Sequence, residues 1–485
     1  MYSCSSLTED TEVRRAVCLC HRPELQALSR RIDADLSRRG FVAGMAASVA
    51  ALGLPFRVQA QTPAASKTGA ILFTNVRLFD GRSATLRDGH LLVEGDRIQS
   101  IGAGTPAAPA GAQTIDGGGR VLMPGLIDAH WHSLFAALPL PVLLQGNIGY
   151  IHMAAAAEAQ RTLMRGFTTV RDLGGPAFAF KQAIDEGLTP GPRIYPCGAM
   201  ITGSGGHGDL RGLSDLPRSP GVPSAVERTG AAAIVDSPDE IRLRVREQLT
   251  QGASQIKVVG GGGVSSPRSP LDLTTLTEAE LRAAVEVAKD WNTYVAVHAY
   301  APATVQRAVT AGAQCIEHAH LMDDTTARMM ADKGVWLSTQ PFLSEEDTGV
   351  LTGPNRAAAL QVFAGTDNLY KLAKKHKLKT AFGSDMLFAP ALARRQGTML
   401  THLTRWYSNK EILSMATADN AQLLALSGPR NPYPGKLGVL EQGAYADLLL
   451  VDGNPLEDVS LLADPDARLV VIMKDGKIHK SLIKG

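Results

Sequence analysis

The sequence of 485 residues has almost no excess charge, no internal repeats and no low-complexity tails. Its 49 basic and 47 acidic side chains leave a formal net charge of +2, which gives no reason to expect nucleic acid or a membrane surface as a partner. The absence of repeats excludes a repeat array. The remaining composition, 45% hydrophobic with 48 glycines, fits an α/β protein with one barrel-sized domain or two domains.

The chain also lacks an apolar run long enough to span a bilayer. Its most apolar stretch, residues 43–56, is about 14 residues long, whereas a spanning helix needs about 20. Arg38-Arg39 precedes this stretch and Val58-Gln59-Ala60 follows it, an arrangement that favours a twin-arginine secretory signal over a buried helix. We therefore predict that residues 1–60 are removed and that the mature protein is periplasmic or secreted, without stable membrane association.

Cysteine is scarce, with five in the whole chain. Cleavage after residue 60 would remove three of them and leave Cys197 and Cys315. These two lie in predicted strands that are far apart in the sequence. We therefore expect no structural disulfide, although the predicted destination is oxidising.

Both ends of the mature chain carry the patterns of short β-strands. Apolar and polar residues alternate in five segments separated by glycine and aspartate turns: 70–79, 90–102, 112–123, 438–452 and 467–480. Asp475-Gly476 is the centre of a predicted hairpin turn. Neither end has enough strands for an independent sheet, so we predict one small β-sandwich built from residues 68–123 and 428–485.

The middle of the chain, residues 124–427, alternates strand-like and helical patterns. The predicted strands are 126–132, 168–173, 193–201, 255–259, 294–299, 315–320, 334–340 and 380–385. Eight β/α units predict a (β/α)8 TIM barrel, whose active site lies at the C-terminal ends of the strands. An insertion rich in glycine, proline and serine, residues 203–236, is long enough to be a lid or specificity loop.

Metal-binding residue types stand at the ends of these strands. In chain order they are His130, His132, Lys257, His298, His318 and Asp385. Side chains alternate along a strand, so His130 and His132 share one face. Buried histidines without partners are costly, so metal ligation explains them better than a polar strand-to-loop junction. Together the set could hold two divalent ions, which indicates a metal-dependent hydrolase.

Lys257 lies within the apolar segment 256–259. It is either an edge-strand residue with an exposed amine or a buried residue whose neutral amine takes up carbon dioxide as a carbamate. The two oxygens of a carbamate could bridge two cations, and the glycines at 260–263 leave room beside it. His320 shares the strand face of His318, so spacing leaves open which of the two would bind metal.

Several motifs resemble those of the metal-dependent amidohydrolase superfamily over nearly all of the mature sequence. They are VLMPGLIDAHWH, GFTTVRDLGG, GASQIKVVGGGGV, VHAYAP, AGAQCIEHAH and AFGSDM. The resemblance is nearest to the branch that contains Xaa-Pro dipeptidases, imidazolonepropionases and ochratoxin-hydrolysing amidohydrolases. It implies two divalent metal ions, for which the ligand types favour zinc, bridged by carbamylated Lys257. By analogy with this branch we also expect a homo-oligomer.

The resemblance assigns the ligands to two metals. One metal would be bound by His130, His132, Lys257 and Asp385, and the other by Lys257, His298 and His318. The family pattern usually has IEHG where this chain has residues 316–319, which implies His318 as the ligand and leaves His320 without a role.

Three further positions have two interpretations each. His207 resembles a strand-three histidine that contacts the substrate carbonyl or carboxylate, but it could be an exposed loop histidine. Tyr300 could donate a hydrogen bond to a substrate carboxylate or belong to the core. For Arg171-Asp172 we favour a structural ion pair over substrate binding.

The implied reaction is hydrolysis of an amide bond. Asp385 would take a proton from the attacking water and deliver it to the departing amine, while His207 helps to polarise the carbonyl. Residues 134–140 and 386–390 are apolar, and either pack on helices or line a pocket for a hydrophobic group. By resemblance, the expected small-molecule substrate is an N-acyl amino acid or dipeptide with a free C-terminal carboxylate, including ochratoxin-like N-acyl-phenylalanines.

Other classes remain open. A cyclic amidase of the imidazolonepropionase type differs only in the pocket loops. A mononuclear deaminase would not need Lys257. A metal-less, non-enzymatic member of the fold would be expected to lack some of the ligands, and this sequence has all six.

Overall fold

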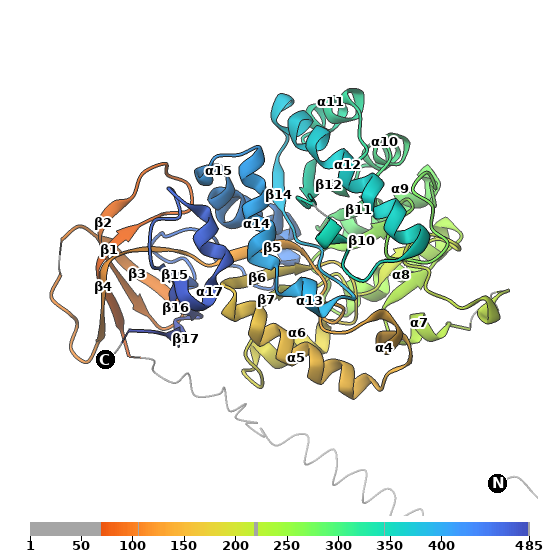
Figure 1. Cartoon of the computed structure of the whole chain (residues 1–485). Coiled ribbons are helices and arrows are strands. Elements are labelled where there is room, and N and C mark those ends of the chain that lie inside the picture. Colours follow the sequence, from red (N-terminus) through yellow and green to blue (C-terminus); the bar gives the residue numbers. More distant parts are fainter. Residues whose placement is uncertain (1–68, 105, 218–221, 344, 484–485) are drawn as a thin grey trace, which may run out of the picture. The chain divides into compact units, whose positions relative to one another are not determined.

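The computed structural model describes residues 69–104, 106–217, 222–343 and 345–483 (Figure 1). These residues belong to one compact unit, Lys67–Gly485. The predicted signal region, with its arginine pair and three cysteines, lies outside the described residues. Within the described ranges, no helix combines the length and apolarity needed to span a membrane.

Both ends of the described chain contribute to one seven-stranded sheet, on the left in Figure 1. In spatial order its strands are β17 (Lys477–Ser481), β16 (Leu469–Lys474), β15 (Leu448–Val451), β4 (Gln113–Pro124), β1 (Ile71–Leu78), β2 (Arg87–Glu94) and β3 (Arg97–Gly102). Asp475 and Gly476 join β16 to β17 with φ of 52° and 67°. Positive φ at both positions is characteristic of a type I′ hairpin turn, which confirms the predicted turn.

This sheet curls on itself because the segment 443–446 hydrogen-bonds to both of its ends. Ile98 N donates to Ala444 O (2.9 Å) at one end, and Gly476 N donates to Ala446 O (3.0 Å) at the other. Buried apolar side chains of β1, β2, β4, β15 and β16 fill the interior. The result is the small β-sandwich, made from both termini, that the sequence predicts.

The strands of the barrel lie between the two halves of that sheet in sequence. They are β5 (Leu126–Trp131), β6 (Phe167–Asp172), β7 (Arg193–Tyr195), β8 (Met200–Thr202), β10 (Ile256–Val259), β11 (Val295–Ala299), β12 (Cys315–His318), β13 (Trp336–Thr339) and β14 (Thr380–Phe382). Neighbours pair in parallel. The fold is the predicted TIM barrel with an additional β-sandwich.

Helices follow the strands and cover the outside of the barrel (Figure 1). The longer ones are α5 (Ile148–Met164), α6 (Phe178–Asp185), α8 (Pro238–Thr250), α9 (Glu278–Asp290), α10 (Pro302–Ala311), α11 (Asp324–Asp332) and α12 (Gly353–Lys375). Shorter ones are α4 (Leu140–Gln145), α7 (Ala225–Arg228), α13 (Pro390–Ala393), α14 (Gln396–Thr401), α15 (Asn409–Ser414), α16 (Asn420–Leu424) and α17 (Pro465–Arg468).

The third barrel strand differs from the prediction because it is broken in the middle. β7 pairs with β6, whereas β8 pairs with β10, and residues 196–199 separate the two. Pro196 has no N–H for a ladder, and Gly198 has φ of 77°. Cys197 therefore lies in the break and Cys315 lies in β12; both are buried and free.

The insertion after β8 is not all loop. Its last part forms an additional strand, β9 (Ala232–Ile234), which pairs in parallel with β8. A short 3-10 helix (Leu213–Asp215) and α7 precede it. The predicted loop therefore extends the barrel wall as well as covering its end.

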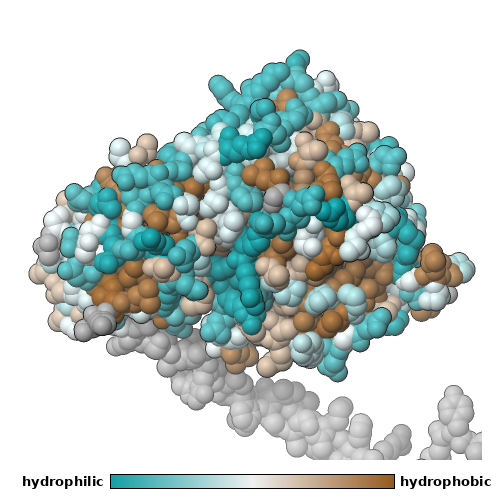
Figure 2. Space-filling model, viewed as in Figure 1, coloured by the Kyte–Doolittle hydropathy of each residue, from teal (hydrophilic) through white to brown (hydrophobic). Residues whose placement is uncertain are grey.

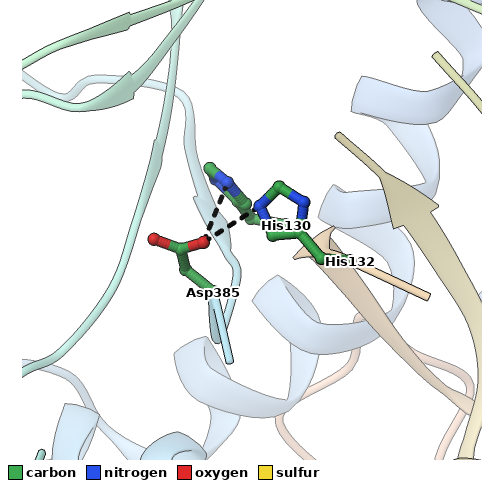
Figure 3. Close-up of side chains that lie close together, drawn as sticks. All are labelled: His130, His132 and Asp385. Atoms are coloured by element: carbon green, nitrogen blue, oxygen red, sulfur yellow. Dashed lines mark ion pairs between the residues drawn. The ribbon is translucent and has the colours of Figure 1, made fainter. Parts of the chain in front are cut away.

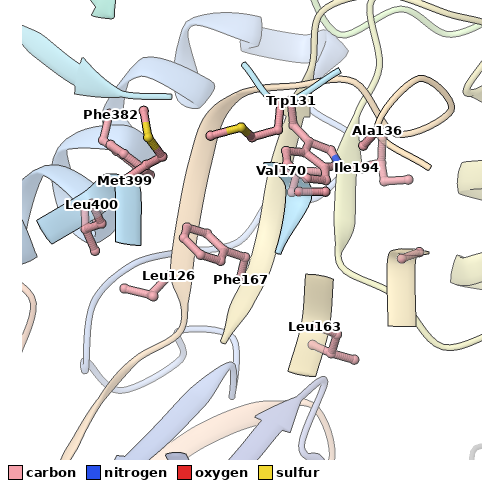
Figure 4. Close-up of a cluster of buried hydrophobic side chains, with 14 of the residues drawn as sticks. Leu126, Trp131, Ala136, Leu163, Phe167, Val170, Ile194, Phe382, Met399 and Leu400 are labelled. Carbon is pink, nitrogen blue, oxygen red and sulfur yellow. The ribbon is translucent and has the colours of Figure 1, made fainter. Parts of the chain in front are cut away.

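The largest buried apolar cluster surrounds the first strands of the barrel (Figure 4). Leu126 and Phe167, on β5 and β6, lie beside Phe382 of β14, and α14 adds Met399 and Leu400. Close packing on this side leaves little freedom to the strands that carry the first candidate ligands.

β5 and β14, the first and eighth barrel strands, are joined by a side chain. Asn420 follows a π-helical turn (Met415–Asp419) and is fully buried. Its Nδ2 donates to Ile127 O (2.7 Å) and Phe382 O (2.8 Å), and its Oδ1 accepts from Phe382 N (3.1 Å). The Asn420 carboxamide thus replaces ladder hydrogen bonds where the barrel closes.

Candidate metal centre

The structure brings the six predicted ligand residues together at the C-terminal end of the barrel, where all line one cavity. His130 lies in β5, His132 lies one residue beyond it, and Asp385 lies three residues beyond β14. His130 Nε2 and His132 Nε2 approach the same oxygen, Asp385 Oδ1, at 3.3 and 3.2 Å (Figure 3). Ligand atoms of these three residues all lie within 4.8 Å of one another, so they could hold one metal ion.

Lys257 lies beside this group and is only 2% exposed. Its Nζ is 3.5 Å from His130 Nε2, and it forms no ion pair within the described part of the chain. Burial lowers the pKa of its amine, an effect that Glu317 and Asp385 oppose. A buried amine without a paired carboxylate is unfavourable as a cation, so this environment favours the neutral or a modified form.

His298 of β11 and His318 of β12 complete the cluster. Their ring centroids are 4.3 Å apart, and the ring of His318 is 4.9 Å from that of His130. Burial, together with the charges of Lys257 and neighbouring rings, lowers the pKa of His130, His298 and His318 well below its usual range. These imidazoles are therefore neutral at physiological pH, and neutral imidazole is the form that binds metals.

Each of these four histidines makes one hydrogen bond to an acceptor at the rim of the cluster. The pairs are His130 Nδ1 with Glu317 Oε2 (2.8 Å), His132 Nδ1 with Gly174 O (3.3 Å), His298 Nε2 with Gly262 O (2.8 Å) and His318 Nδ1 with Gln340 Oε1 (2.7 Å). The ring nitrogen that faces the acceptor must donate, so the other nitrogen keeps its lone pair. This arrangement is typical of metal-binding histidines, and the donor set fits divalent cations.

Two of the candidate ligands have strained backbones. His318 has φ of 78° and Asp385 has φ of 51°, in the left-handed region that residues other than glycine seldom adopt. Such strain concentrates at functional sites, where the surrounding structure holds it. Gly383 permits the close approach of β14, because a Cβ there would lie 2.3 Å from His130 Cβ.

Glu317 and Arg171 form a buried pair that sequence reasoning missed. Arg171 donates to Glu317 Oε1 (2.6 Å) and to Ala129 O (2.6 Å), and neither side chain of the pair is exposed. The expected pair of Arg171 with Asp172 is therefore wrong; Asp172 accepts from the N–H groups of Ser133 and Gly174 instead. Each charge lies within a predicted strand of the barrel, and that was the available signal, because charges buried in a barrel need partners.

His207 is buried rather than exposed, and it lines the same cavity. Its ring stacks on that of His298 with centroids 4.5 Å apart, and its Nε2 lies 3.4 Å from Ser265 Oγ. Burial, with Lys257 and His132 nearby, lowers the pKa of His207 to about 3. Gly263 makes this position possible, because a Cβ there would lie 2.3 Å from His207 Nδ1.

The side chains of Tyr300 and His320 lie in different surroundings. Tyr300 lines the cavity and meets the ring of His298 edge-on at 5.1 Å. His320 stacks instead on Phe342 at 5.7 Å and its Nε2 donates to Gln340 O at 2.9 Å. Of the two histidines that strand spacing left open, His318 faces the cluster and His320 does not.

The cavity has an empty volume of about 940 Å³, which includes space open to solvent. Beyond the polar cluster its walls are mostly apolar, with Met200, Leu210, Val350, Leu351, Phe363 and Leu392 among them. Met386–Ala389 also line it, whereas Leu134 and Phe135 of the other apolar segment line a neighbouring groove. The cavity can therefore hold a hydrophobic group next to the polar cluster.

Known proteins resemble the chain over most of its length. Residues 121–485 match the Amidohydrolase family. Ochratoxinase of Aspergillus niger is 29% identical over 419 residues, which are 83% of this chain and 85% of that protein. A solved prolidase complexed with N-methylphosphonate-L-proline is 33% identical, with a TM-score of 0.79 and coverage of 85% of this chain and 100% of that chain. A solved amidohydrolase is 34% identical, with a TM-score of 0.78 and coverage of 86% and 100%.

Proposed function

Because this chain belongs to the amidohydrolase family and is a hydrolase of amide bonds, we propose that it cleaves N-acyl amino acids or dipeptides with a free C-terminal carboxylate, using two divalent metal ions. The convergence of six donor residues on one end of an apolar cavity is the observation that carries the proposal. The similar prolidase supports it, because N-methylphosphonate-L-proline is an N-substituted amino acid with a carboxylate.

In this proposal His130, His132 and Asp385 would hold one ion, and His298 and His318 would hold the other. Lys257, as a carbamate, would contribute an oxygen to each. Nitrogen and oxygen donors of this kind favour zinc. When bound, such ions supply Lewis-acid polarisation of a carbonyl and lower the pKa of an attacking water.

The carboxylate of Asp385 would move the proton. One of its oxygens faces both His130 and His132, and its side chain is partly exposed to the cavity. From this position it can accept a proton from water on the cluster side and pass it to the leaving nitrogen on the cavity side.

His207 and Tyr300 would act as hydrogen-bond donors to the substrate. His207 Nδ1 is buried with no hydrogen-bond partner among the described residues, so the ring is best satisfied with its proton on Nε2, toward Ser265 and the cavity. Burial raises the pKa of Tyr300 well above its usual range, so its hydroxyl keeps its proton. Two neutral donors beside the cluster suit a substrate carbonyl and carboxylate.

A substrate panel tests this proposal. Zinc-loaded protein should hydrolyse N-acyl amino acids, Xaa-Pro dipeptides and N-acyl-phenylalanines, and should bind about two metal ions per chain. Lys257→Ala should abolish turnover and the tight binding of one ion, whereas Lys474→Ala, a matched buried lysine of the β-sandwich, should do neither. A preference for lactams or cyclic imides would instead favour an imidazolonepropionase-like activity. Unaltered turnover in Lys257→Ala would show that the reaction does not need a carbamate on Lys257.

We further propose that a twin-arginine signal exports the folded protein. The support is the sequence pattern of Arg38-Arg39 ahead of an apolar run. Replacing both arginines by lysine should retain the protein in the cytoplasm at its full length, and processing of this variant at residue 60 would contradict the proposal.

A further inference from the structure

A second apolar space lies next to the candidate active-site cavity. We name it the α4–α5 groove, because α4 and the start of α5 form much of its wall; its lining includes Leu143, Leu144, Ile148 and Ile151. The groove is shallow and open to solvent along its length, so a bound group would lie along it and would not be enclosed. Thr229 is the only polar residue among its described walls, so the groove suits an uncharged hydrophobic group.

Two side chains separate the groove from the cavity. Leu210 and Phe388 line both spaces. Phe388 has φ of 58°, held by a hydrogen bond from its N–H to Phe135 O (2.9 Å) and by a ring contact with Phe135 at 5.6 Å. Left-handed backbone at a bulky residue is unusual, and an outlier in a wall between two spaces points to a functional role for that wall. Leu210 and Phe388 are therefore the side chains that a group reaching from the cavity into the groove would have to pass.

The outer part of the groove is open to solvent although it is apolar. Leu144 is 37% and Ile148 is 49% exposed. Figure 2 shows hydrophobic surface in the region between α4 and α13 of Figure 1. Exposed apolar patches of this kind commonly mark binding sites. The polar cluster and this apolar groove therefore lie on opposite sides of the Leu210–Phe388 partition.

We propose that the α4–α5 groove is a subsite for the acyl tail of an amide substrate, which enters it past Leu210 and Phe388. The inference rests on the proposed function and narrows its substrate class to N-acyl amino acids with long aliphatic or extended aromatic acyl groups. The amide and carboxylate stay at the polar cluster, while the uncharged tail is partly removed from water. Each methylene in the groove should raise kcat/KM by up to about fourfold, the factor for full burial.

A chain-length series tests the groove. The substrates are N-acyl-L-phenylalanines from acetyl to dodecanoyl, and the zinc-loaded enzyme is compared with Ile148→Asp. Ile148 is the first residue of α5, where an acidic side chain is compatible with the helix, so the variant should fold. Leu243→Asp is the matched control, because Leu243 is 51% exposed and lies outside both spaces.

We expect kcat/KM to rise steeply once the acyl chain is long enough to pass the partition. The rise should flatten in Ile148→Asp and persist in Leu243→Asp. A flat series in the unsubstituted enzyme, or an equal rise in Ile148→Asp, would overturn the subsite while hydrolysis of the acetyl compound still supported the proposed function. Failure to hydrolyse the whole series would overturn both. An unchanged rise with an altered oligomeric state in Ile148→Asp would assign the groove to a second copy instead.

Discussion

Glu317 accepts the Nδ1–H of His130 at 2.8 Å, and so connects a candidate metal ligand to a carboxylate that Arg171 holds from the other side. All three side chains are buried. The contact fixes the proton of His130 on Nδ1 and directs Nε2 toward Asp385. Glu317 and Arg171 therefore influence the charge and orientation of the candidate metal ligands although neither would touch a metal.

Glu317→Gln should weaken metal binding about 10- to 100-fold, because the amide holds His130 less firmly. It should also lower the free energy of unfolding by about 3 kcal/mol or more, since Arg171 would be buried without its partner charge. Cobalt titration and urea denaturation measure the two effects. The matched control is Asp447→Asn, which weakens the buried pair between Asp447, next to β15 of the β-sandwich, and Arg193 of the barrel strand β7. The role assigned to Glu317 fails if both variants lose stability and neither loses affinity for metal.

His318→Gln and His320→Gln should differ in metal content. His318 faces the cluster, whereas His320 Nε2 is engaged by Gln340 O. We therefore expect His318→Gln to retain about one ion per chain and His320→Gln to retain two, with a modest loss of stability. Metal analysis after gel filtration distinguishes them. Loss of an ion in the His320 variant would reverse the assignment.

Asn420→Leu should destabilise the protein by about 3 kcal/mol or more, because three backbone groups of β5 and β14 would lose their partner. Asn409→Leu is a matched control, since Asn409 also donates to two backbone carbonyls, those of Leu456 and Glu457, but is only half-buried. We expect a loss of about 1 kcal/mol there. If urea denaturation showed the same loss of unfolding free energy in both variants, the hydrogen bonds of Asn420 would contribute no more to stability than those of Asn409.

His207 should make the metal-free protein sensitive to mild acid. Its pKa in the folded chain is about 3, below the value of about 6.5 in an unfolded chain, so the unfolded state binds a proton that the folded state does not. Stability should therefore fall as the pH decreases from 7.5 to 5, with a contribution from His207 of about 2 kcal/mol.

The neutral variant His207→Gln removes that contribution. Its free energy of unfolding should depend less steeply on pH than that of the unsubstituted protein, in urea titrations of chelator-treated samples. Parallel pH dependences for the two proteins would refute the assignment of a depressed pKa to His207.

The sequence could predict the barrel and the position of its polar cluster because strand periodicity and barrel geometry constrain both. An active-site residue at the end of each strand must lie at one end of a TM barrel, so His130, Lys257 and Asp385 could be grouped without coordinates. The pairing of Arg171 with Glu317 could not be assigned in this way. These residues lie 146 positions apart and meet only when the barrel closes.

Period-two reasoning failed where a strand ended early. It placed His318 and His320 on one face, but β12 ends at His318, and positive φ at His318 and Ala319 turns the chain away. The strand β9 was missed for another reason. Its sequence, Ala-Ala-Ile, contains little of the β-branched and aromatic character that marks strands, so pairing with β8 determines its conformation.

The parallel barrel is inserted into a sheet whose halves come from opposite ends of the chain, and this sets an order for folding. Residues 121–124 of β4 pair with residues 448–451 of β15, so the pairing waits until nearly the whole polypeptide has been synthesised. Until then the edge of β4 remains a template for pairing with other chains. A product truncated before β15 should therefore aggregate. The chain becomes protected from this kind of aggregation only when its C-terminal strands have been made.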